Sequence, residues 1–166
     1  RKVFYRSLSA AAKRLRDSRV PRMALQDPSK SSWRKLYTSN NDQALITLTG
    51  LDHATFGWLH NKFESMYKKY TPFGEEGRMR LITSVGGQPR LMSAADALGL
   101  ALAWTRTRGS QMVLQIIFGM PGTSVSMYIR FARRLVIMVL KSDPDAAICP
   151  PTIVKICEYQ QAIAEK

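Results

Sequence analysis

The residues that are most informative about the fold run from Ser93 to Leu140 and read SAADALGLALAWTRTRGSQMVLQIIFGMPGTSVSMYIRFARRLVIMVL. They predict three successive helices with a tight turn before the third. The first, over 94–104, is apolar on nearly every side, as is typical of the buried centre of a bundle. A short helix over 111–118 follows. A glycine-containing turn of three or four residues before a capped helix is typical of a helix-turn-helix, which this stretch therefore predicts.

Residue types that favour helix ends mark the boundaries of these three helices. Ser93, with Asp96 three residues later, predicts an N-cap with a capping box. Gly119 is suited to the left-handed position that ends the second helix. Either Thr123 or Ser124 can cap the start of the third helix, because a side-chain hydroxyl accepts hydrogen bonds from free helical N–H groups.

The third helix divides into an apolar half and a basic half when its residues advance by about 100° each. Burial of the apolar half would offset the cost of ordering the chain. That half consists of Val125, Tyr128, Ile129, Ala132, Leu135, Val136, Val139 and Leu140. The outward half consists of Ser126, Met127, Arg130, Arg134 and Lys141, with Arg133 at the boundary. Ile137 and Met138 also face outward, so we expect a later helix, another domain or a partner to cover that end.

The composition favours an anionic partner. The 166 residues are 45% hydrophobic, which is enough for a real core, and they carry a formal net charge of +13. Eleven Lys or Arg residues but only two acids fall within residues 1–40. We therefore expect a basic, partly mobile N-terminal arm over 1–44. The arm is either simply solvated, or it follows phosphates or serves as a nuclear-import signal.

The remaining segments complete an all-α prediction: a small helical bundle that contains the helix-turn-helix over 93–140. A helix capped by Asp52 carries one stripe of large apolar residues, namely Phe56, Leu59, Phe63, Met66, Tyr67 and Tyr70. A Gly- and Pro-rich linker over 71–92 has room for a short strand pair around 79–85. The expected organisation is the arm at 1–44, a helical domain at 45–142, and a loop and C-terminal helix at 143–166.

The last helix is expected over 152–165, where an apolar stripe falls on one face. The stripe consists of Ile153, Ile156, Cys157, Gln160 and Ile163. Cys149 and Cys157 form neither a disulfide framework nor a zinc-binding spacing, so we interpret both as reduced packing residues. No apolar run reaches about 18 residues, and no signal peptide is visible, so we expect no membrane association.

No pattern in the sequence indicates catalysis. His53 and His60 lie two helical turns apart without a third ligand, so we expect no metal site. Asp143 and Asp145 are interpreted as loop and cap residues. Phosphate-loop and nucleophile-elbow motifs are both missing. We therefore expect no enzyme activity, no cofactor and no small-molecule substrate in this chain, and binding is the favoured class of function.

Four ordered segments together resemble one family. They read LTGLDHATFGWLHNKF (48–63), GGQPRLMSAADALGLAL (86–102), LALAWTRTRGSQMVLQIIFGMPGTSVSMYIRFARR (100–134) and PPTIVKICEYQQAIAEK (150–166). They resemble the N-terminal helix-turn-helix region of Harbinger/PIF-like DDE transposases and of the eukaryotic host proteins derived from them. The resemblance covers roughly residues 45–166. It implies a nuclear protein that binds double-stranded DNA.

The resemblance also offers a reason why the sequence shows no catalytic pattern. In that family a metal-dependent, RNase H-like nuclease domain with three acidic residues follows this region, and its first Asp would lie shortly beyond Lys166. The resemblance therefore implies that no residue of this chain is catalytic. It also implies either a C-terminal nuclease domain or self-association as a protein partner.

DNA contacts are expected at the third helix of the motif and at the turn after its first helix. The candidates are Thr123, Ser124, Ser126, Met127, Arg130, Arg133 and Arg134, with Arg106 and Arg108 as backbone clamps. Because the early turns offer Ser126 and Met127 rather than Asn, Gln or Arg, we expect modest base readout. The alternative hypothesis is a structural, protein-interaction or dimerisation module without direct DNA contact.

Overall fold

The computed structural model describes residues 20–73, 79–82, 89–107, 110–146 and 153–164. Its α-helices are α2 (Ser32–Thr38), α3 (Asp42–Thr49), α4 (His53–Lys69), α5 (Ala94–Arg106), α6 (Gln111–Phe118), α7 (Gly122–Lys141) and α8 (Ile153–Ala164). Short 3-10 turns occur at η1 (Arg22–Ala24), η2 (Pro28–Lys30) and η4 (Pro144–Ala146). The expected all-α class is confirmed, with one small addition: the two-stranded ribbon of β1 (Tyr70–Thr71) and β2 (Arg80–Leu81).

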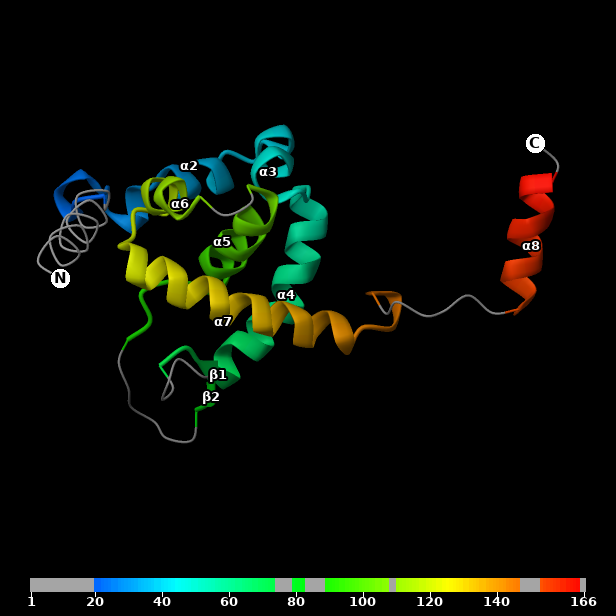
Figure 1. Cartoon of the computed structure of the whole chain (residues 1–166). Helices are drawn as coiled ribbons and strands as arrows, with labels where there is room; N and C mark the ends of the chain where they lie inside the picture. The colour runs from blue at the N-terminus through cyan, green and yellow to red at the C-terminus, as the bar shows by residue number, and fades with distance from the viewer. Residues whose placement is uncertain (1–19, 74–78, 83–88, 108–109, 147–152, 165–166) are drawn as a thin grey trace, which may run out of the picture.

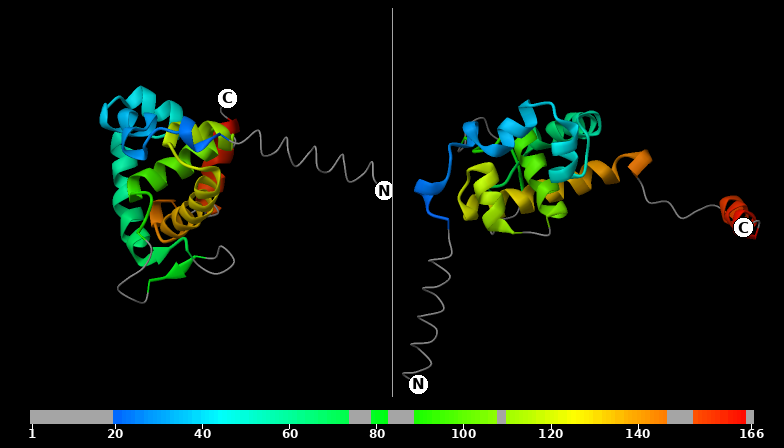
Figure 2. Two further views of the ribbon diagram at one scale, coloured as in Figure 1. Left: turned by 90° about the vertical axis from the view of Figure 1, so that its left-hand side faces the viewer. Right: turned by 90° about the horizontal axis from the view of Figure 1, so that it is seen from above.

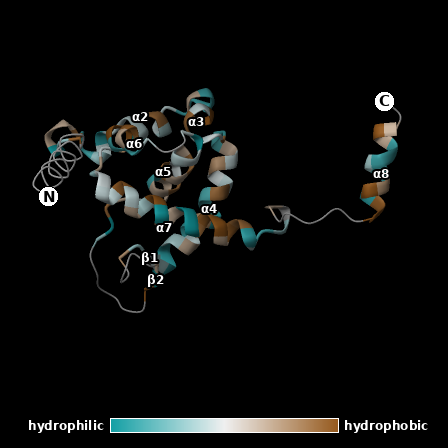
Figure 3. Cartoon of the chain, in the orientation of Figure 1, coloured by the Kyte–Doolittle hydropathy of each residue, from teal (hydrophilic) through white to brown (hydrophobic). Residues whose placement is uncertain are grey.

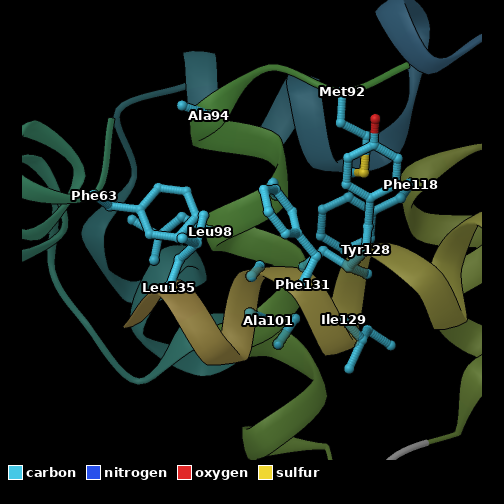
Figure 4. Packing of buried hydrophobic residues seen from close by; sticks show 14 of the residues in the cluster. Phe63, Met92, Ala94, Leu98, Ala101, Phe118, Tyr128, Ile129, Phe131 and Leu135 are labelled. Atoms are coloured by element: carbon cyan, nitrogen blue, oxygen red, sulfur yellow. The ribbon is translucent and has the colours of Figure 1, made fainter. Parts of the chain in front are cut away.

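Helix α5 forms the centre of the bundle (Figure 1). All of its residues from Ala94 to Ala101 are buried, and α3, α4, α6 and α7 each pack against it. The views in Figure 2 show α5 between α4 and α7. In Figure 4, side chains from these three helices meet in one cluster, including Phe63, Leu98 and Phe131. The all-round apolar surface of α5 is thus explained by neighbours on every side.

Most predicted helix ends are confirmed. Ser93 and Asp96 form the capping box of α5, and the Asp52 side chain accepts a hydrogen bond from the Thr55 N–H at the start of α4. Gly119 ends α6 with a left-handed φ of 66°. These ends are local hydrogen-bonding patterns, so nearby residues suffice to specify them.

The predicted cap of the third helix is wrong. Helix α7 begins at Gly122 with Pro121 as its N-cap, so Thr123 and Ser124 lie inside the first turn and neither side chain caps the helix. The carbonyl of Pro121 accepts the first helical hydrogen bond, from Val125 N at 3.0 Å. The extended backbone of Pro121 (φ −61°, ψ 147°) suits an N-cap, since proline fixes φ near this value.

The two predicted faces of the third helix are confirmed except at Met127, which was expected to face outward but is half-buried against the core. Val125, Tyr128, Ile129, Ala132, Leu135 and Val139 are buried, and Val136 and Leu140 are half-buried. Phe131, which was assigned to neither face from the sequence, is also buried. Ile137 is 48% exposed, so no described segment covers it fully, whereas Met138 is half-buried against the core.

Part of the expected arm is folded instead. Residues 1–19 lie outside the described residues, but α2 and α3 are helices, and Trp33 of α2 is only 1% exposed. The Trp33 indole Nε1 donates to Asp96 Oδ1 of α5 at 2.9 Å. The expected mobile arm is therefore wrong from residue 31 onward, because a buried aromatic side chain with a satisfied N–H anchors this segment to the central helix.

Two other expectations need correction. Only one strand of the expected pair, β2, lies within 79–85, and it pairs antiparallel with β1 at the end of α4. The side chains of α8 are exposed throughout, although several are hydrophobic (Figure 3). Cys157 is a free, exposed thiol rather than a packing residue, since no described segment packs on its helix. Cys149 lies outside the described residues.

Within the described part of the chain, no single helix is both long and apolar enough to cross a membrane. Helices α6 and α7 meet that requirement only when taken together, and the chain bends by 97° between them.

Candidate nucleic-acid interface

Helices α6 and α7 have the relative orientation of a helix-turn-helix. The chain bends by 97° between them, and the helices of this motif cross at about 90–120°. Gly119 supplies the left-handed turn, and Met120 N donates to Gln115 O at 3.0 Å. The Met120 side chain is buried, so the turn itself is anchored in the core. α7 is thereby held at a fixed angle across α6.

The exposed face of α7 is basic. Arg130, Arg133 and Arg134 are all exposed, and none of them forms an ion pair with a carboxylate within the described residues. Arg130 Nε lies 3.4 Å from the carbonyl of Ser126, to which it donates a long hydrogen bond. Unpaired guanidinium groups on one face suit phosphate binding, because their planar donors match phosphate oxygens.

Two contacts hold polar residues of this face in place. The Ser126 hydroxyl donates to Gln111 Oε1 of α6 at 3.0 Å, which ties the first turns of α7 to the preceding helix. The Arg133 guanidinium carbon lies 4.4 Å from the centre of the Trp104 ring on α5, which is a cation–π geometry. Arg133 therefore leans toward α5, as its predicted position at the boundary of the two faces implies.

The other predicted contact residues have mixed environments. Thr123 is exposed, Ser124 is half-buried, and Met127 is half-buried against the core. Arg106 is exposed, but it ends α5 rather than lying in the turn after it. Arg108 lies outside the described residues. The structure thus exposes four of the predicted α7 contacts, whereas Ser124, Ser126 and Met127 are half-buried. The four exposed residues are Thr123, Arg130, Arg133 and Arg134.

A pocket of about 650 Å³ opens at the N-terminal end of α7. Its polar lining residues are Arg22, Gln111, Gln115, Thr123, Ser126 and Arg130. Sequence reasoning missed Arg22, Gln111 and Gln115. Arg22 is distant in sequence from the motif, and the two glutamines look like ordinary helix residues until α6 is placed against α7.

Other ionisable groups have structural roles. Arg34 pairs with Asp96 at 2.7 Å, and Lys62 pairs with the buried Asp143. Hydrogen bonds from the backbone N–H and ring of His53 lower the pKa of Asp42. Among the described residues, no three His, Cys, Asp or Glu side chains gather where they could hold a metal ion.

Comparison with known proteins adds no relative: no family model, curated protein or solved structure matches this chain.

Proposed function

We propose that this chain is the DNA-binding module of a nuclear, DDE-type transposase or of a protein derived from one, with α7 as its recognition helix. The observation that carries the proposal is the pairing of two features. Helix α7 leaves α6 at 97°, and its solvent face carries three exposed arginines without acidic partners in the described chain. The net charge of +13 supports an anionic partner.

The proposed contacts divide into two kinds. Arg130 and Arg134, one turn apart, bind phosphates and set the register of the helix on the duplex. Ser126 and Met127 face the base edges. Because a hydroxyl and a thioether distinguish bases poorly, sequence readout from α7 is modest and affinity comes mainly from phosphate contacts.

The test is fluorescence anisotropy with a random-sequence DNA duplex across a salt series. Wild type is compared with Arg130→Ala/Arg134→Ala. We expect binding that weakens steeply with salt, and a slope of log affinity against log salt that is smaller by about 2 in the double variant, since each phosphate contact contributes about 0.9.

The matched control is Lys68→Ala/Lys69→Ala on the last turn of α4, which removes the same charge from another helix. If both double variants lose affinity equally, binding reflects total charge and α7 is not the recognition helix. Absence of binding by the wild type at low salt would reject the proposal altogether.

A second candidate function is protein interaction, and exposed apolar residues on α6 favour it. Met112, Val113 and Ile116 are 48%, 46% and 55% exposed. A helix that only crosses a phosphate backbone has no need of such side chains. This candidate predicts self-association that persists at high salt, which sedimentation equilibrium measures. A monomer at every salt concentration would reject self-association.

A further inference from the structure

Gln115 is a mostly buried polar side chain without a hydrogen-bond partner in the described part of the chain. It is only 7% exposed, and its amide makes no hydrogen bond to any described residue. It lines the pocket at the start of α7. A Cβ built on Gly122 would lie 3.0 Å from Gln115 Nε2, so the amide lies directly beside the first residue of α7. Among the described residues no fully buried side-chain nitrogen or oxygen lacks a partner, so the Gln115 amide is open to the pocket and free to donate to a ligand there.

The same pocket contains free backbone donors. Helix α7 has no side-chain cap, and Pro121 at its N-cap has no N–H. The N–H groups of Gly122, Thr123 and Ser124 have no acceptor within the described structure. Three uncapped N–H groups at the positive end of a 20-residue helix favour an anion there.

The side chains around the pocket have matching charge. Arg22 and Arg130 both line it, and no carboxylate does so among the described lining residues. Arg22 comes from the turn η1, so the positive charge converges from two distant parts of the chain. The amide of Gln115, the helix N-terminus and the two guanidinium groups together form a site for an anion with several oxygen acceptors.

From this convergence we infer that the pocket binds one phosphodiester group of the DNA backbone, which deepens the proposed function and rests on it. Gln115 Nε2 and the N–H groups at the start of α7 donate to the phosphate oxygens, and Arg22 and Arg130 neutralise its charge. The pocket volume of about 650 Å³ leaves room for a phosphate group. A phosphate held here would fix the N-terminus of α7 against the duplex.

The first experiment measures DNA affinity for Gln115→Met, which keeps the length of the side chain but removes its donor. We expect an affinity about tenfold lower, equivalent to one hydrogen bond to a charged group, with an unchanged salt slope because glutamine carries no charge. Arg22→Ala should lower the slope by about 1. Gln43→Met, on the exposed surface of α3, is the matched control and should bind as wild type.

Gly122→Ala provides a variant that leaves Gln115 in place. The added Cβ would press on the amide at 3.0 Å and narrow the pocket, while alanine suits the first turn of a helix. We expect lower DNA affinity without loss of thermal stability. Suppose that Gln115→Met and Gly122→Ala both bind DNA with wild-type affinity, while Arg130→Ala/Arg134→Ala binds more weakly. This result would reject phosphate binding in the pocket but leave the proposed function intact.

An NMR titration with inorganic phosphate tests the anion directly. We expect shifts of the Gln115 side-chain amide and of the Thr123 and Ser124 N–H signals, all reduced in Arg22→Ala. Shifts with inorganic phosphate but no DNA binding at low salt would overturn both the proposed function and the DNA backbone as the occupant. If these signals do not shift but DNA binding is normal, anion binding in the pocket is rejected and the proposed function is not.

Discussion

The indole ring of Trp33 lies directly against the backbone of Gly99 in the central helix. A Cβ at position 99 would lie 2.2 Å from Trp33 Cζ2 and 2.3 Å from Cη2, which is far inside van der Waals contact. Trp33 is almost fully buried there and donates to Asp96, one turn earlier on α5. The absence of a side chain at Gly99 thus makes room for the residue that joins α2 to the bundle.

Gly99→Ala should destabilise the fold. The indole would have to move away from α5, and overpacking of this kind costs about 1–3 kcal/mol even though alanine favours helices. Urea unfolding measures the loss. The control is Gly57→Ala in α4, where a Cβ meets nothing within 4 Å, so the same change should raise stability by roughly 0.5–1 kcal/mol. Equal effects at both glycines would contradict the close approach of Trp33.

Asp96→Ala should also lower stability. The carboxylate accepts from Trp33 Nε1, pairs with Arg34 and completes the capping box with Ser93. Its loss would leave the indole N–H unsatisfied in the core, at a cost of about 2–4 kcal/mol together with the lost cap. Arg34→Ala is the control, because its side chain is 37% exposed and should contribute less than about 1 kcal/mol. A smaller loss for Asp96→Ala than for Arg34→Ala would refute this account.

Tyr67 should make the fold sensitive to alkali. Burial raises the pKa of its hydroxyl well above the usual value, and the hydroxyl donates to Met92 O at 2.7 Å. The unfolded chain therefore releases this proton more readily, so the contribution to stability is complete below about pH 10 and is lost as pH rises further.

The comparison is with Tyr67→Phe. Wild type should be the more stable protein at neutral pH by about 1 kcal/mol, from the hydrogen bond, and this advantage should shrink above about pH 10. Free energies of unfolding in urea across this range measure it. A constant difference at every pH would show that Tyr67 ionises as easily in the folded state as in the unfolded state.

Removal of residues 147–166 should leave the bundle as stable as before. The side chains of α8 are exposed along its whole length, and none of its residues belongs to the core cluster. An isolated 12-residue helix gains little from its own hydrogen bonds in water. Thermal unfolding of the shortened chain should match that of the full chain. A clear drop in the melting temperature would mean that α8 packs on the bundle.

Local residue patterns were sufficient for most features of helices α4 to α7. The capping residues Ser93 and Asp52, the left-handed Gly119 and the two faces of α7 all follow from interactions within about one helical turn or from helical periodicity. The same periodicity placed Arg130 and Arg134 on an exposed face. These features were predictable because each depends on neighbours in sequence.

Long-range packing decides the features that the local sequence pattern could not predict, namely the folding of the basic segment and the formation of the pocket. The basic segment before residue 45 reads as a solvated arm, yet Trp33 is buried because Gly99 leaves space and Asp96 accepts its N–H, more than sixty residues away. The pocket likewise requires Arg22, Gln115 and the start of α7 to converge. Helical periodicity identifies which face of a helix is buried, but which distant side chains meet there depends on complementary shape and satisfied hydrogen bonds in the packed core.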